Sequence, residues 1–169
     1  NIKLFMNVCN AVQKAGIDAC FKVIGDGPRL NWARSFAKKH ELNNITFEGR
    51  VTRDEVASKM KAADVLIFTS LSEANTSTFF EALQSICIPV ALDLDGFSRN
   101  ITSEIGFKIN INQPYAKIVH EYVAVLRELS MNKDHVIRLR DNIKKNLSSY
   151  SWEELFNRHY KQIEKVRLR

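Results

Sequence analysis

The feature that most constrains the fold is a set of short apolar runs separated by segments of helix length. Val65–Phe68 has the sequence Val-Leu-Ile-Phe and Ile88–Leu92 has the sequence Ile-Pro-Val-Ala-Leu, so a strand made of either run is apolar on both faces. Strands of this kind are typical of parallel sheets that helices cover on two sides. The sequence therefore predicts a doubly wound, Rossmann-like α/β fold.

Helical and strand periods alternate along the chain. Helices are expected at Leu4 to Ala15, Leu30 to His40, Arg53 to Ala62 and Thr78 to Ile86, and strands at Cys20 to Gly25, Ile45 to Gly49, Asp64 to Ser70, Ile88 to Asp93 and Gly106 to Ile111. The pattern Thr52-Arg-Asp-Glu55 predicts a capping box at the start of one helix. After Pro114 the apolar spacing is helical to the C-terminus. We expect one domain over residues 1–169 with a helical C-terminal tail.

The composition excludes several classes of protein. The chain has 169 residues, 45% of them hydrophobic, which is enough for one domain with a substantial core. No apolar run approaches the roughly 18 residues that span a bilayer, and the start does not resemble an export signal. Cys9, Cys20 and Cys87 lack the spacing of a disulfide framework or a zinc site, and no histidine has a patterned partner. A cytoplasmic protein without a metal site is expected, and no nucleic-acid partner.

The segment 151–169 combines cationic and apolar side chains at helical spacing. The net charge of the chain is +6, and the last stretch contributes Arg158, Lys161, Lys165, Arg167 and Arg169. One interpretation is a solvated helix face, and the other is contact with anionic lipid head groups or another polyanion. The apolar stripe consists of Leu155, Phe156, Tyr160, Ile163 and Val166. A stripe of this size needs a partner surface.

Four loops follow the predicted strands, where ligands bind in open α/β sheets. Gly25-Asp-Gly-Pro28 permits a tight turn, but Leu30 stands where a dinucleotide fingerprint has its third glycine. Gly49-Arg-Val51 either meets a base or phosphate or simply begins a helix. Ser70 to Thr78 is small and polar and leads to a helix start that can present N–H groups to a diphosphate. Asp93-Leu-Asp-Gly-Phe97 has the composition of a turn.

Glu73 and Glu81 are two carboxylates eight positions apart between an apolar strand and an apolar helix. Thr78-Phe-Phe-Glu81 also has the spacing of a capping box, in which the glutamate would bond back to the main chain. Glu73 has no cationic neighbour in sequence and fits a solvated loop. Spacing alone leaves the pair open between a ligand clamp and two structural roles.

Taken in order, these motifs resemble the C-terminal half of a retaining glycosyltransferase of the group 1 family, which has the two-Rossmann-domain GT-B architecture. The resemblance extends over nearly the whole chain. It is carried by Val23-Ile-Gly-Asp-Gly-Pro28, Ile45-Thr-Phe-Glu-Gly-Arg-Val51, Ala63-Asp-Val-Leu-Ile-Phe-Thr-Ser70, Glu73 to Glu81 with Ala82-Leu83, Pro89-Val90, Gly96 and Tyr150-Ser-Trp-Glu153.

The resemblance implies a donor site for a nucleoside diphosphate sugar. Glu73 would face the sugar hydroxyls as the catalytic-site carboxylate, and Glu81 would hydrogen-bond the ribose. The main chain between them would receive the sugar and diphosphate, and the loops after the first two strands would border the base. The implied donor-binding residues besides Glu81 are Asn75, Thr76, Ser77, Gly25, Gly27, Arg50 and Val51. The family generally needs no metal, because basic side chains and a helix N-terminus neutralise the leaving diphosphate.

Three departures from the family pattern are visible. First, the family has three features that should precede Asn1: a strand carrying Gly-Arg, a lysine before the first helix and the acceptor-binding N-terminal domain. In the family, the segment that corresponds to 151–169 crosses back to that N-terminal half. Asn75-Thr-Ser77 stands where many members have Gly-Phe-Gly. Asp95-Gly-Phe-Ser-Arg99 replaces Gly-Gly-x-x-Glu, so an arginine stands in place of an acid. We therefore expect this piece alone to be inactive.

The function expected from the resemblance is transfer of a hexosyl group, with retention, to a glycan or lipid-linked acceptor in polysaccharide or glycolipid biosynthesis. Two alternatives keep the fold. A nucleotide-sugar 2-epimerase would need catalytic carboxylates and a histidine that the sequence does not display, and a non-catalytic nucleotide-sugar-binding module would fit the altered loop at Asn75 to Ser77 and the arginine at position 99.

Overall fold

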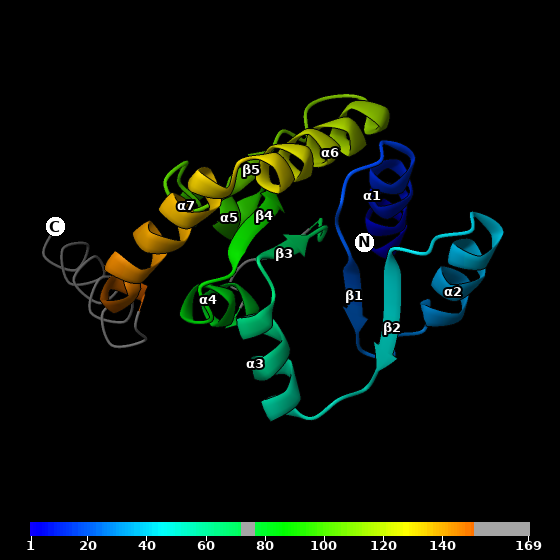
Figure 1. The fold of residues 1–169 in the computed structure, drawn as a ribbon, viewed down its shortest axis with the longest axis horizontal. Coiled ribbons are helices and arrows are strands. Elements are labelled where there is room, and N and C mark those ends of the chain that lie inside the picture. Colours follow the sequence, from blue (N-terminus) through cyan, green and yellow to red (C-terminus); the bar gives the residue numbers. More distant parts are fainter. Residues whose placement is uncertain (72–76, 151–169) are drawn as a thin grey trace, which may run out of the picture.

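The computed structural model describes residues 1–71 and 77–150 and contains alternating helices and strands (Figure 1). In chain order they are α1 (Ile2–Lys14), β1 (Phe21–Ile24), α2 (Leu30–Lys39), β2 (Ile45–Gly49), α3 (Arg53–Ala62), β3 (Val65–Phe68), α4 (Ser77–Gln84), β4 (Ile88–Leu92), α5 (Asp95–Asn100), β5 (Phe107–Ile109), α6 (Tyr115–Met131), α7 (Lys133–Lys145) and the 3-10 turn Leu147–Tyr150. Every helix and strand expected in this part of the chain is present. The α/β prediction is confirmed, and α5 is an addition to it.

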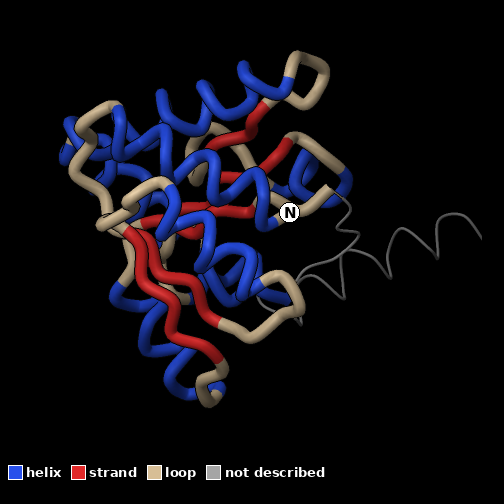
Figure 2. Tube along the Cα trace, turned by 90° about the vertical axis from the view of Figure 1, so that its right-hand side faces the viewer, coloured by secondary structure: helices blue, strands red, loops and turns tan. Residues whose placement is uncertain are grey.

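All strand pairs among the described residues are parallel, and they form two sheets. One sheet pairs β1 with β2, and the other has the order β3-β4-β5. Figure 2 shows the strands of both sheets lying among the helices. This is the arrangement that apolar runs on both faces of a strand require, because each face must be covered.

The core is concentrated around the three-stranded sheet. Every residue of β4 is buried, while none of β2 is. The main core cluster draws on α1, α4, α6 and α7, and α1 packs against α6 beside the sheet (Figure 1). Tyr122 of α6 is completely buried, and its hydroxyl donates to the carbonyl oxygen of Phe68 at 2.6 Å. That bond ties α6 to the carboxyl end of β3.

The chain begins beside the carboxyl end of β3. The Thr69 hydroxyl donates to the main-chain oxygen of Asn1 at 3.1 Å, and the Asn1 side chain caps α1 by accepting from the N–H of Leu4. The N-terminus of α1 therefore lies at the edge of the sheet where the strand-following loops gather. Among the described helices, none is both long enough and apolar enough to cross a membrane.

Candidate functional site

The loops after β1 and β2 are joined through glycine main chain. The N–H of Gly25 donates to the carbonyl oxygen of Gly49 at 2.7 Å. Gly25 has φ +121° and Gly49 has φ +71°, conformations that side chains with a Cβ rarely adopt. The predicted site residues of these two loops thus lie together, and the backbone conformation favours glycine at positions 25 and 49.

Gly27 leaves open space beside the first loop. A Cβ built at Gly27 or at Gly25 would meet no atom within 4 Å. Neighbouring atoms therefore do not crowd either glycine, as expected for a wall built from small residues. The N–H of Leu30 donates to the Gly27 carbonyl oxygen at 2.9 Å, which connects this loop to the start of α2.

Arg50 lies across the first loop and pairs with Asp26. Its Nε is 3.2 Å from Asp26 Oδ2, and the two side chains are 83% and 53% exposed. Exposed pairs of this kind contribute little to stability, so Arg50 can exchange Asp26 for another anion at low cost. Val51, the next residue, is half-buried and leads into α3.

The start of α3 is fixed by the capping box that the sequence predicts. The N–H of Glu55 donates to Thr52 Oγ1 at 3.3 Å, and the N–H of Thr52 donates to Glu55 Oε2 at 2.7 Å. These bonds, the main-chain bond from Thr52 first, hold the pKa of Glu55 below its usual range. Lys59 pairs with Glu48 of β2 and so connects the last turn of the helix to the sheet.

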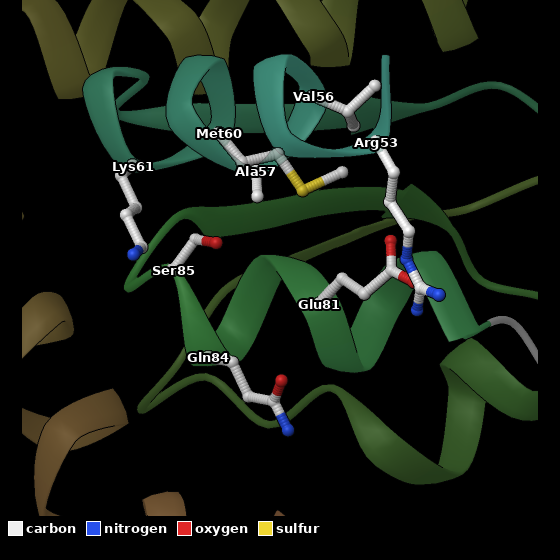
Figure 3. Close-up of a pocket in the computed structure, with 8 residues that line it drawn as sticks. All are labelled: Arg53, Val56, Ala57, Met60, Lys61, Glu81, Gln84 and Ser85. Carbon is white, nitrogen blue, oxygen red and sulfur yellow. The ribbon is translucent and has the colours of Figure 1, made fainter.

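Glu81 lies half-buried in the second turn of α4, which begins at the exposed Ser77. Because the helix already includes Ser77, Thr78 is an internal residue and not the cap that a Thr78–Glu81 capping box would need. The Glu81 side chain lies instead in a groove beside α3 (Figure 3). Glu73, Asn75 and Thr76 lie outside the described residues, so their predicted roles stay predictions.

The groove between α3 and α4 has a volume of about 400 Å³. Its lining residues are Arg53, Val56, Ala57, Met60 and Lys61 from α3, with Glu81, Gln84 and Ser85 from the α4 side. Figure 3 shows the guanidinium of Arg53 and the carboxylate of Glu81 at one end, and Lys61 and Ser85 at the other. The groove therefore has an apolar wall between charged side chains at its two ends.

Sequence reasoning missed the α3 wall of this groove. Arg53, Val56 and Met60 share one helix face at spacings of three and four residues, and that pattern was available in the sequence. An apolar spacing of this type ordinarily indicates a helix face that packs in the core. The pattern does not reveal that Arg53 faces Glu81 of another helix.

The loop after β4 differs from the expected turn. Residues 95–100 form the short helix α5, and the Asp93 carboxylate accepts a hydrogen bond from the Ser98 hydroxyl, with Lys108 Nζ 3.9 Å away. Phe97 is 3% exposed and packs against Phe68 with ring centroids 4.8 Å apart. Burial of this ring explains why the segment coils into a helix, and Asp93 serves the fold.

The thiols and potential metal ligands show no reactive arrangement in the part of the chain that the structure describes. Burial raises the pKa of Cys87 to about 12 and that of Cys9 further, so both thiols stay protonated within the core. No three His, Cys, Asp or Glu side chains gather as metal ligands within residues 1–71 and 77–150. Metal independence remains a prediction from the resemblance.

Comparison with known proteins identifies the family. The family model described as "Glycosyl transferases group 1" matches residues 1–146. The chain is 28% identical over 139 residues to the uncharacterized glycosyltransferase MJ1178 of Methanocaldococcus jannaschii, covering 82% of this chain and 38% of that protein. It is 35% identical over 86 residues to the alpha-monoglucosyldiacylglycerol synthase of Streptococcus pneumoniae, covering 50% of this chain and 19% of that one.

The fold also matches solved glycosyltransferases. The pneumococcal O-GlcNAc transferase GtfA, in complex with UDP and GlcNAc, superposes with a TM-score of 0.79 at 17% identity, over 98% of this chain and 33% of its own. The chain thus belongs to the group 1 glycosyl transferases and has the fold of a GT-B C-terminal domain. It spans less than two fifths of each of these three proteins.

Proposed function

We propose that this domain is the donor-binding half of a retaining hexosyltransferase that uses a nucleoside diphosphate sugar. The observation that carries the proposal is the half-buried Glu81 beside the N-terminus of α4, at the edge of the sheet where parallel strands end. A carboxylate accepts two ribose hydroxyls well, and the helix N-terminus favours the diphosphate. Glu73 would orient the sugar, and no metal would be needed.

The similar proteins support the donor and acceptor classes. One was solved with UDP and GlcNAc, and another is named as a synthase of a glucosylated diacylglycerol. We infer a glycan or lipid-linked acceptor in polysaccharide or glycolipid biosynthesis. A cytoplasmic location with peripheral contact to the membrane belongs to the same proposal, and the cationic segment 151–169 on which it depends lies outside the described residues.

The lengths of the similar proteins support the proposal that this domain is one part of a larger enzyme, because the chain covers 38% of the Methanocaldococcus jannaschii glycosyltransferase and 33% of the pneumococcal O-GlcNAc transferase. The same proposal places an acceptor-binding domain in the whole protein, against which the segment 151–169 would pack.

Nucleotide binding to the Glu81→Ala variant tests the proposed function. We expect UDP affinity, measured by calorimetry, to fall by about tenfold or more, because hydrogen bonds to a charged group contribute about 1.5 to 3 kcal/mol. Glu104→Ala, which removes an exposed carboxylate that does not line the groove, is the matched control. Unchanged affinity in Glu81→Ala with an intact fold would remove the ribose role.

The catalytic assignment of Glu73 needs an assay of the whole enzyme. We expect Glu73→Ala to abolish sugar transfer while UDP affinity changes little, because this carboxylate would face only the sugar. Turnover at the wild-type rate would contradict the sugar-facing role. Release of free sugar instead of a glycosylated product would favour epimerase-like or hydrolytic chemistry over transfer.

A further inference from the structure

We propose that the solvent side of α2 binds anionic lipid head groups at a membrane surface. This α2 face consists of Trp32, Arg34, Lys38 and Lys39, all of them exposed. The inference deepens the peripheral membrane contact in the proposed function and rests on that part of it, because it assigns the contact to residues of the described fold. It does not depend on the donor site.

The charge of α2 has one sign. From Arg29, which precedes the helix, to Lys39 at its end, the chain has cationic side chains and no acidic one. Within residues 1–71 and 77–150, no carboxylate forms an ion pair with Arg29, Arg34, Lys38 or Lys39. The Arg34 guanidinium lies over the Phe47 ring, 5.8 Å from its centroid. Cations without a carboxylate partner are available to attract an anionic surface.

Helical geometry gathers these side chains on the solvent side of α2. Arg34 and Lys38 are four residues apart, so they are neighbours on the helix surface. Trp32 and Lys39 are seven residues apart, about two turns, and share a second row. The buried residues of the helix lie on the opposite side and are Ala33 and Ala37. The α2 face is therefore a convex cationic surface with a tryptophan at its border.

Trp32 adds an amphipathic ring to the cations. The residue is 40% exposed, and its ring packs against that of Phe36 with centroids 5.3 Å apart. Tryptophan is enriched where a bilayer meets water, because the ring body is apolar and its N–H remains hydrogen-bonded. Cations combined with an exposed tryptophan are typical of helices that lie on anionic membranes. Trp32 therefore supplies the apolar contact that the cations of the α2 face lack.

The position of α2 suits a planar surface. Figure 1 shows α2 at the outer side of β1 and β2, at the opposite end of the domain from α7. A protein interface has an apolar centre larger than one exposed ring, whereas a bilayer surface needs charge and an interfacial anchor. The N–H of Leu30, at the start of α2, donates to the Gly27 carbonyl oxygen. Contact through α2 would therefore hold that loop of the candidate site near the bilayer.

Sedimentation with lipid vesicles tests the proposal on the full chain. Vesicles of phosphatidylcholine are compared with vesicles of equal parts phosphatidylcholine and phosphatidylglycerol, at low and at high salt. We expect the wild type to sediment only with the anionic vesicles, and less at high salt because dissolved ions screen the attraction. A variant with Arg34→Gln, Lys38→Gln and Lys39→Gln together should bind the anionic vesicles about tenfold more weakly or worse.

A matched control variant removes three cations at the other end of the domain. It carries Lys133→Gln, Arg138→Gln and Lys145→Gln, all at exposed positions of α7. We expect its vesicle affinity to stay within about twofold of the wild type, because α7 would not touch the membrane. Equal Tm values for both variants should verify that neither triple substitution disturbs the fold. An equal loss of affinity in the two variants would show that net charge alone drives binding, which would overturn the proposal.

The fluorescence of Trp32 gives a second readout that a structural role would not change. The other tryptophan of the chain is Trp152, so a Trp152→Phe variant reports on Trp32 alone. We expect its emission to move to shorter wavelength with anionic vesicles and to stay unchanged with phosphatidylcholine, because the ring leaves water only on contact with the bilayer. Vesicle binding without this shift would exclude the α2 face as the contact.

Two further outcomes would overturn the inference. A variant with Arg158→Gln, Lys161→Gln and Lys165→Gln that loses vesicle affinity, while the α2 variant keeps it, would assign the membrane contact to the segment 151–169. Binding to heparin through the α2 face without binding to vesicles would make this face a site for soluble polyanions. In either case UDP binding that depends on Glu81 would leave the donor-binding function intact, whereas absence of UDP binding would contradict that function and not this inference.

Discussion

The two sheets of this domain differ in what surrounds them. The strand β4 of the three-stranded sheet is buried along its whole length, whereas β2 of the two-stranded sheet has no buried residue. The glycine loops of the candidate site follow β1 and β2, and the aromatic cluster of Phe68, Phe79 and Phe97 packs beside the other sheet. Stability is therefore concentrated in the half that contains β3, β4 and β5. The first two loops of the candidate site follow strands of the β1-β2 half, which is less deeply buried.

The largest expected effect is at Phe79, in the stable half. This side chain is 2% exposed, and its ring contacts those of Phe80 and Phe97 at centroid distances of 5.2 and 6.0 Å. We expect Phe79→Ala to lower the free energy of unfolding by about 3 to 5 kcal/mol, measured in urea. Phe36→Ala, at a half-buried position of α2, should cost less than half as much. Equal losses of unfolding free energy in the two variants would contradict the conclusion that stability is concentrated in the β3-β4-β5 half.

A glycine in each half gives the next prediction. A Cβ at Gly106 would lie 2.3 Å from the carbonyl oxygen of Pro89 in β4, so Gly106→Ala should destabilise the protein by about 1 to 3 kcal/mol. Gly27→Ala should change stability by less than about 0.5 kcal/mol, because its Cβ would meet open space. Thermal unfolding of the two variants checks this prediction. A larger loss of stability in Gly27→Ala than in Gly106→Ala would contradict it.

The same contrast explains what the sequence could predict. The strands β3 and β4 were predictable because short continuous apolar runs between helix-length segments are typical of strands that are covered on both faces. The capping box at Thr52 was predictable because it is local, with both partners three residues apart. The helix α5 was not, because it depends on the burial of Phe97 against aromatic rings of β3 and α4.

The site was predictable only in part for the same physical reason. Gly25, Gly27 and Arg50 could be placed from the rule that ligands bind where parallel strands end. The role of Glu81 could not be decided from spacing, since a cap and a ligand contact share the same pattern. The facing position of Arg53 and Glu81 depends on the placement of α3 beside α4 in the tertiary structure, which no local signal encodes.

A smaller effect is expected at the bond that joins α6 to β3. Tyr122→Phe removes the hydroxyl that donates to the Phe68 carbonyl oxygen, and we expect a loss of about 1 kcal/mol because the bond is buried. Tyr115→Phe is the matched control, since its hydroxyl accepts from the Asn7 amide at an exposed position. Urea denaturation should separate the two variants, and an equal or larger loss at Tyr115 would show that burial does not decide the value of these bonds.

The smallest effect on stability is expected in the β1-β2 half and depends on pH. The pKa of Glu55 is lowered in the folded protein, first by the main-chain bond from Thr52, so folding favours its ionised form. The stability that this contributes is complete above the ordinary glutamate pKa and is lost as the pH falls through the lowered pKa of the folded state. Glu55→Gln should therefore lower Tm slightly at neutral pH, and the difference from the wild type should shrink toward zero as the solution becomes acidic. A difference that grew on acidification would mean that the carboxylate is not held by the capping box.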